Sequence, residues 1–192
     1  FEEEVAEYTG APFAVAVDSC TNALFLACKY HNAKEVTIPK RTYLSVPMSI
    51  MHSGAEVVFE DLDWTGVYQL KPYPIYDSAK RFTSNMYIPG TAMCLSFHIK
   101  KLLAIGKGGM ILTDDYKMVE WLRKARYEGR GEVNYKDDSI EMLGWNMYMT
   151  PQQAAHGLAL MQNYPEHVSD LDENNGYRDL TEFPVFKGCK VL

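Results

Sequence analysis

Residues 92–113 read AMCLSFHIKKLLAIGKGGMILT, and this stretch decides the fold. Its first part, Ala92–Phe97, is almost wholly apolar and predicts a buried strand, and Met110–Thr113 predicts a second one. Between them lie two lysines, Lys100 and Lys101, and then a glycine-rich run. A partly desolvated lysine held beside a tight turn can act as a nucleophile toward carbonyl groups. A solvated basic turn is the alternative interpretation of the same residues.

The chain before this stretch alternates short apolar runs with segments of helical spacing. The expected strands are Phe13–Val17, Glu35–Ile38 and Ala55–Glu60. The expected helices are residues 1–8 (ending at Gly10), Thr21–Tyr30 and Tyr43–His52. Such alternation indicates βαβ units, in which a parallel sheet is covered by helices on both faces. We therefore predict an α/β fold of three layers, α/β/α, with a mainly parallel sheet.

The remaining segments are less regular. Asp61–Pro74 holds two prolines and little periodicity, so we expect a loop there, followed by a short strand that ends at Asp77. Beyond the central stretch we expect a helix at Tyr116–Tyr127, a loop at Gly129–Asp138, and a helix capped by Thr150 that runs to about Asn163.

The composition excludes several classes of protein. Hydrophobic residues make up 47% and charged residues 23%, which is typical of one globular domain with a core. A net charge of −6 without a Lys/Arg cluster argues against a nucleic-acid partner. No apolar run approaches the roughly 20 residues of a membrane-spanning helix. Four dispersed cysteines without a CxxC pair indicate free thiols and no metal site, and we expect a cytoplasmic protein.

Two polar features lie where an α/β fold binds ligands. The run Asp18–Thr21 falls between a strand and a helix, and helix N-termini bind phosphate. Asp77 lies at the carboxyl end of a predicted strand, the edge at which open α/β sheets bind ligands. Taken alone, Ser19 or Thr21 could simply cap the helix, and Asp77 could cap a turn. A third feature, Gly144–Asn146, is by itself a turn with an aromatic anchor.

In their order along the chain, these features resemble motifs of the DegT/DnrJ/StrS sugar aminotransferases. The matching segments are YTGAPFAVAVDSCTNAL at 8–24, Pro39 with Thr42 and Tyr43, GAEVVFED at 54–61, DSA at 77–79, SFHIKKLLAIGKGG at 96–109 and LGWNMYMTPQQAA at 143–155. Each motif alone is weak, but six in the right order are specific. The resemblance implies the fold of the type I aspartate aminotransferases and pyridoxal 5'-phosphate as the cofactor.

The resemblance also implies a role for each matched residue. Lys101, favoured over Lys100 by its register with the glycine pair, would form the Schiff base with the cofactor and shuttle a proton. Asp77 would pair with the pyridinium nitrogen so that the ring acts as an electron sink. Tyr43 would stack on the ring, and Asn146 would reach the phosphate bound by a neighbouring subunit. The residues expected to hold the phosphate are Cys20, Thr21 and Ser96.

The chain also departs from the family pattern. Cys20 stands where members commonly carry glycine, Lys80 where they carry Gln or His, and Tyr148 where they carry arginine. Members are about twice as long. We expect an internal deletion at 61–75 and the absence of most of the small domain. The expected organisation is a reduced cofactor-binding domain at 1–163 and a C-terminal helical remnant at 164–192.

The expected function is therefore a pyridoxal-phosphate-dependent transaminase of nucleotide sugar biosynthesis. It would move an amino group from an amino acid, with glutamate as the expected donor, to a keto sugar nucleotide. The resemblance implies a homodimer with the active site at the interface. The alternative is a reduced homologue that binds the cofactor or a partner without turnover. A related dehydratase is disfavoured, because such relatives replace the Schiff-base lysine with histidine and Lys101 is present.

Overall fold

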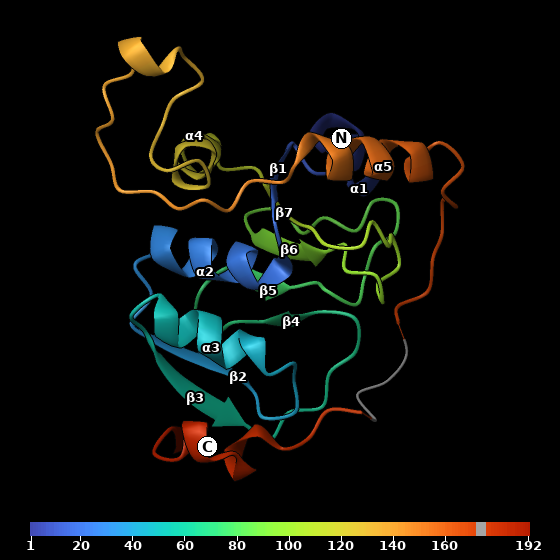
Figure 1. The fold of residues 1–192 in the computed structure, drawn as a ribbon. Coiled ribbons are helices and arrows are strands. Elements are labelled where there is room, and N and C mark those ends of the chain that lie inside the picture. Colours follow the sequence, from blue (N-terminus) through green and yellow to red (C-terminus); the bar gives the residue numbers. More distant parts are fainter. Residues whose placement is uncertain (172–175) are drawn as a thin grey trace.

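The computed structural model describes residues 1–171 and 176–192, which form two sheets with helices packed around them (Figure 1). The larger sheet has the strand order β1-β7-β6-β5-β4. Its strands are β1 (Phe13–Val17), β4 (Tyr68–Gln69), β5 (Ile75–Asp77), β6 (Ala92–Ser96) and β7 (Gly109–Thr113). The smaller sheet, of order β2-β3-β8, consists of β2 (Glu35–Pro39), β3 (Glu56–Glu60) and β8 (Lys190–Val191).

The helices begin and end close to the positions that the sequence predicts. They are α1 (Glu2–Thr9), α2 (Cys20–Tyr30), α3 (Ser45–His52), α4 (Tyr116–Ala125) and α5 (Pro151–Met161), with 3-10 turns at Tyr135–Asp137, Leu180–Glu182 and Pro184–Phe186. Local chemistry sets the boundaries. Gly10 ends α1 in the left-handed conformation at φ 74°, where a side chain would be strained. Thr150 and Gln153 form a capping box that begins α5.

The α/β class is confirmed, but the strand pairing is mixed where the sequence pattern predicted mainly parallel pairs. Three pairs are parallel, namely β2–β3, β3–β8 and β5–β6. The other three are antiparallel, and β7 takes part in two of them, with β1 and with β6. For β7 the reason lies in residues 97–108, which connect β6 to β7 through a compact turn instead of a crossover helix. A chain that turns back without a crossover returns beside its own strand in the antiparallel direction.

Side chains alternate between the two faces of the larger sheet and produce two hydrophobic clusters. On one face Val15, Cys94 and Ile111 pack with residues of α2 and α4. On the opposite face Ala14, Met93 and Met110 pack with residues of α1, α5 and the turn after β6. The same division is visible in Figure 1, where α1 and α5 lie together, away from α2. This arrangement confirms the three-layer α/β/α architecture.

The C-terminal tail packs into the same molecule. Leu180 and Phe186 are 2% and 3% exposed and belong to the cluster that contains α2 and β3. The tail ends in β8, which pairs with β3 in parallel. Earlier in the tail, Asp170 forms a two-pronged ion pair with Arg81, with N···O distances of 2.8 and 2.6 Å. In the described parts, no helix has the length and apolar character needed to cross a membrane.

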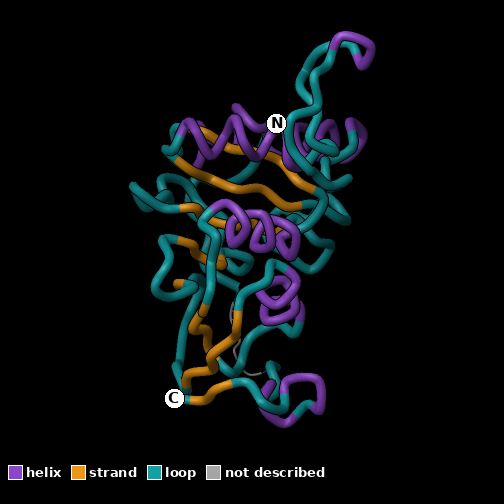
Figure 2. The backbone as a smooth tube through the Cα atoms, turned by 90° about the vertical axis from the view of Figure 1, so that its left-hand side faces the viewer, coloured by secondary structure: helices purple, strands orange, loops and turns teal. Residues whose placement is uncertain are grey.

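A segment that we call the arm, residues 130–143, projects from the body next to α4 (Figures 1 and 2). Its base is tight, because a Cβ at Gly129 would lie 2.0 Å from the Met142 carbonyl oxygen, and one at Gly144 would lie 2.0 Å from the Gly129 nitrogen. Beyond the base most side chains are exposed, and they include large apolar groups. Exposed apolar residues of the arm are Val133, Tyr135, Ile140 and Leu143.

Candidate active site

A cavity of about 610 Å³ lies at the start of α2 and the ends of β5 and β6. Six of the seven residues expected in the site line it, namely Cys20, Thr21, Tyr43, Asp77, Ser96 and Lys101. They come from separate elements that the sheet topology brings to one place. A larger hollow of about 710 Å³, between α1, α4 and the arm, is lined by none of them. The chemistry-bearing side chains therefore converge on the smaller cavity.

The start of α2 is pressed against β7. A Cβ at Gly109 would lie 2.3 Å from the Ser19 carbonyl carbon and 2.5 Å from the Cys20 nitrogen, so this position requires glycine. The Ser19 hydroxyl caps the helix by accepting from the Asn22 N–H at 3.2 Å. In the described part of the chain, the N–H groups of Cys20 and Thr21 donate to no protein acceptor. Together with the helix dipole they form a donor set suited to an anion.

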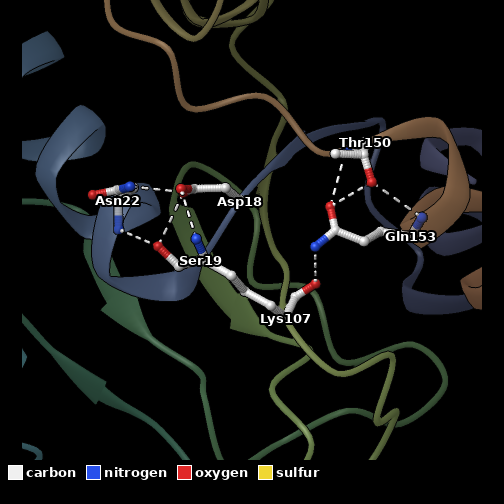
Figure 3. Close-up of polar contacts among 6 residues, drawn as sticks. All are labelled: Asp18, Ser19, Asn22, Lys107, Thr150 and Gln153. Atoms are coloured by element: carbon white, nitrogen blue, oxygen red, sulfur yellow. Dashed lines mark hydrogen bonds and ion pairs between the residues drawn. The ribbon is translucent and has the colours of Figure 1, made fainter.

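The glycine-rich turn is held to this helix start from two sides (Figure 3). The ammonium of Lys107 lies 3.3 Å from the Asp18 carboxylate, which also accepts a 2.7 Å hydrogen bond from Asn22. On the other side, the Gln153 amide donates to the Lys107 carbonyl oxygen at 2.9 Å. The same Gln153 side chain accepts from the Thr150 N–H at 2.8 Å in the capping box of α5. The turn that carries Lys107 is thus fixed between α2 and α5.

Asp77 lies on the floor of the cavity and is 5% exposed. Its Oδ1 accepts from the Ala79 N–H at 3.0 Å, and its Oδ2 accepts from the Tyr68 hydroxyl at 2.8 Å. Burial raises the pKa of Asp77, although these two hydrogen bonds and the charges of Lys101 and Lys80 act in the opposite direction. Sequence reasoning missed Tyr68, because it falls in the segment 61–74 that reads as a loop.

Lysines approach Asp77 from two directions. Lys101 is half-buried, and its backbone N–H donates to the His98 carbonyl at 2.8 Å within the turn after β6. Lys80 is 6% exposed, and its ammonium lies 5.1 Å from the ring centre of Trp64 and 4.6 Å from that of Tyr177. Such cation–π contacts hold a buried cation in place. Trp64 and Tyr177 complete the cavity wall, and no local motif marks either residue.

Cys20 shows how a side chain is accommodated where family members commonly have glycine. The thiol is buried, with Sγ 3.4 Å from the Cys94 carbonyl oxygen and 3.9 Å from Asp77 Oδ1. Burial, and next the charge of Asp77, raises the pKa of the Cys20 thiol well above its usual value, so the sulfur keeps its proton. All four cysteines are free, with Cys20, Cys28 and Cys94 buried and Cys189 half-buried.

Asn146 is the expected site residue that the fold does not bring into this cavity. Its side chain is exposed and donates to Glu128 Oε1 at 2.9 Å. The backbone on either side is anchored to the body, because the N–H groups of Trp145 and Met147 donate to carbonyls of α4 and its C-cap at 2.7 and 2.9 Å. Asn146 thus faces outward at the base of the arm, away from the cavity of its own chain.

Comparisons with known proteins agree with this architecture. The sequence profile of the DegT/DnrJ/EryC1/StrS aminotransferase family matches residues 1–86 and 85–180. The spore coat polysaccharide biosynthesis protein SpsC of Bacillus subtilis is 30% identical, over 98% of this chain and 62% of its own length. That alignment runs over 246 positions, so the relative carries additional residues inside the matched span. A GDP-perosamine synthase of Caulobacter vibrioides is 26% identical, over 92% of this chain and 59% of its own.

Solved structures share the fold. PseC of Helicobacter pylori, an aminotransferase involved in the biosynthesis of pseudoaminic acid, superimposes with a TM-score of 0.72 at 19% identity, over 85% of this chain and 57% of that one. A putative sugar aminotransferase of Streptococcus pneumoniae, in its PMP form, gives 0.72 at 19% identity, over 85% and 58%. The chain thus spans less than two thirds of the length of these relatives.

Proposed function

Because this chain belongs to the DegT/DnrJ/EryC1/StrS aminotransferase family, we propose that it is a pyridoxal-phosphate-dependent aminotransferase. Its substrates would be an amino acid, with glutamate the expected donor, and a keto sugar nucleotide. The observation that carries the proposal is the cavity. In one place it combines a lysine, a buried carboxylate and the N–H groups of a helix start. We place the reaction in the cytoplasm, where free thiols stay reduced.

The donor set of the cavity is complementary to each part of the cofactor. The helix start and the hydroxyls of Thr21 and Ser96 suit a phosphate. Asp77 suits a protonated ring nitrogen, and Lys101 suits an aldehyde. When bound, pyridoxal phosphate supplies an electron sink for the carbon atom that loses or gains a proton. In this proposal Lys101 attaches the cofactor and then holds and returns that proton, while Tyr43 covers the ring at the cavity mouth.

We further propose that a second copy of the chain completes the site. Asn146 faces outward beside an arm that exposes Leu143 to 90% and Tyr135 to 66%. Exposed apolar groups of this kind favour association, and a two-fold dimer would let each chain offer Asn146 to the other.

The first experiment locates the attachment. The protein is mixed with pyridoxal phosphate, reduced with borohydride, digested and mapped by mass spectrometry. We expect the label on Lys101, its loss in Lys101→Ala, and its retention in the matched control Lys100→Ala. A label on Lys100, or none in the original protein, would contradict the assignment.

The second experiment separates turnover from binding. The alternative function, a reduced homologue that binds without turnover, is favoured by a specific observation, the additional residues that the relative carries inside the matched span. Glutamate is added to the cofactor-loaded protein. An aminotransferase converts it to 2-oxoglutarate, one molecule per site, and leaves the cofactor in its amine form. Attachment to Lys101 without formation of 2-oxoglutarate from glutamate, or of an oxo acid from any other amino acid, supports the binding-only alternative.

A further inference from the structure

Two hydroxyl groups line up behind Asp77. The Tyr68 hydroxyl lies 2.8 Å from Asp77 Oδ2, and Thr42 Oγ1 lies 2.7 Å from the Tyr68 oxygen. All three side chains are buried, with exposures of 5% for Asp77, 4% for Tyr68 and 2% for Thr42. The row is therefore held by the packing of β4, β5 and the segment before α3, and bulk water does not compete for it.

The chemistry of the three groups fixes the direction of these hydrogen bonds. An ionised carboxylate can only accept, so the single proton of Tyr68 is donated to Asp77. The Tyr68 oxygen must then accept from Thr42, which makes the threonine hydroxyl the first donor in the row. Burial, and next the charge of Asp77, raises the pKa of Tyr68 well above its usual value, so the phenol keeps the proton that it donates. Hydrogen bonds in such a buried row polarise and strengthen one another.

We propose that Tyr68 is a positioning residue for Asp77, and that its hydroxyl, oriented by Thr42, keeps this carboxylate ionised and directed toward the cavity. The inference rests on the proposed function, in which Asp77 pairs with the ring nitrogen of the cofactor. A carboxylic acid would pair with that nitrogen less strongly than a carboxylate does. The short segment 61–74 thus supplies Tyr68, the side chain on which the charge and orientation of the Asp77 carboxylate depend.

The surroundings of Asp77 explain why the hydrogen bond from Tyr68 matters for its charge. Burial favours the neutral acid, and the raised pKa of Asp77 shows that burial outweighs the opposing influences. In the described part of the chain, six titratable groups act on Asp77 or are acted on by it, namely Cys20, Tyr68, Lys80, Cys94, Lys101 and Tyr177. Removal of the Tyr68 hydroxyl leaves Asp77 with the Ala79 N–H at 3.0 Å and the weaker Cys20 thiol at 3.9 Å as hydrogen-bond donors among the described residues, and both of them bond to Oδ1. The balance would then move further toward the neutral acid.

The test follows Asp77 directly, in cofactor-free protein labelled with ¹³C at the aspartate carboxyls. We expect Tyr68→Phe to raise the titration midpoint of Asp77 by about one to two pH units, the equivalent of one hydrogen bond to a charged group. Thr42→Val should raise it by less, because it removes a donor one step away. The matched control is Tyr30→Phe, which removes a 2.8 Å Tyr–Asp hydrogen bond at Asp115, outside the cavity. We expect no change at Asp77 in that variant.

Each result decides the inference. An unchanged Asp77 midpoint in Tyr68→Phe overturns it, and so does an equal shift in Tyr30→Phe, which would indicate general loosening. Thr42→Val keeps the tyrosine ring and decides the question if Tyr68→Phe does not fold. Because this titration needs no cofactor, it stands apart from the proposed function, which fails separately if the original protein binds no pyridoxal phosphate. If the cofactor binds, its affinity should fall at low pH as Asp77 takes up a proton. In Tyr68→Phe this fall should begin at a higher pH, in step with the raised midpoint of Asp77.

Discussion

At the cavity, side chains form hydrogen bonds to groups of other elements: Tyr68 of β4 donates to Asp77 of β5, and Gln153 of α5 donates to the Lys107 carbonyl. In the arm, by contrast, Leu143 and Tyr135 extend into solvent, 90% and 66% exposed. The segment 144–149 connects the arm to the rest of the chain. The side chains at the cavity are buried and hydrogen-bonded, whereas those of the arm are exposed. The cavity is thus organised by contacts within one chain, whereas the exposed arm is the surface that we propose for contact with a second copy. Four predictions test this contrast, starting from the largest expected effect.

The largest expected difference between the two regions is in how each tolerates an added methyl group. Gly109→Ala places a Cβ 2.3 Å from the backbone of Ser19, so we expect a loss of about 3 kcal/mol in the free energy of unfolding, at the upper end for overpacking. Gly131→Ala in the arm meets its nearest atom at 3.6 Å, an ordinary contact, and should change stability by less than about 0.5 kcal/mol. Denaturant unfolding measures both. Equal losses would show that the arm is packed as tightly as the cavity.

The next prediction tests whether the arm serves another chain. We expect Asn146→Ala to weaken cofactor binding about tenfold, or about 1.4 kcal/mol, the value of one phosphate hydrogen bond. Lys101→Ala abolishes attachment. When the two variants are mixed and allowed to exchange subunits, some sites should combine an intact Lys101 with an intact Asn146 and recover tight binding. Recovery fails if both residues serve the cavity of the same chain.

A smaller effect is expected at the capping box that joins α5 to the cavity. Thr150→Ala removes the cap and should lower stability by about 1 kcal/mol. Since Gln153 also bonds the Lys107 carbonyl, amide hydrogen exchange should increase both in the first turn of α5 and in residues 106–108. Gln152→Ala, an exposed neighbour in the same turn, is the control and should leave both unchanged. Faster exchange confined to α5 would mean that the turn is held without Gln153.

The smallest effect concerns the tail. Burial acts to raise the pKa of Asp179, but hydrogen bonds from Thr181 and Lys40 outweigh it and hold that pKa below its usual value. The associated stability is therefore present above the unfolded pKa, about 3.9, and is lost as the pH falls through the lower folded value. Tryptophan fluorescence from Trp64, beside Tyr177, should report this acid loosening, and Asp179→Asn should remove its pH dependence. The exposed arm residue Asp137, changed to Asn, should leave the transition in place.

The sequence predicted regular elements well and the connections poorly. Strands such as Ala92–Ser96 are short apolar runs, and Ser19, Gly10 and Thr150 mark helix ends by local hydrogen bonding, so one sequence suffices to find them. The mixed pairing of β7 depends on how residues 97–108 turn back, which no periodicity encodes. For the same reason Tyr68 and Tyr177 were missed. Each reaches the cavity through tertiary contacts, from segments whose composition indicates a loop or a tail.

The hydrogen bond from Gln153 to the Lys107 carbonyl also bears on the order in which the cavity forms during synthesis. The two residues lie 46 positions apart, and the amide that fixes the turn arrives with α5. During synthesis the N-terminal part of a chain emerges first. The start of α2 and the turn that carries Lys107 would therefore leave the ribosome before Gln153, which fixes that turn to α5, has been synthesised. Competence to hold a ligand would thus be acquired late, when α5 packs against the turn and Tyr177, which follows α5, completes the cavity wall.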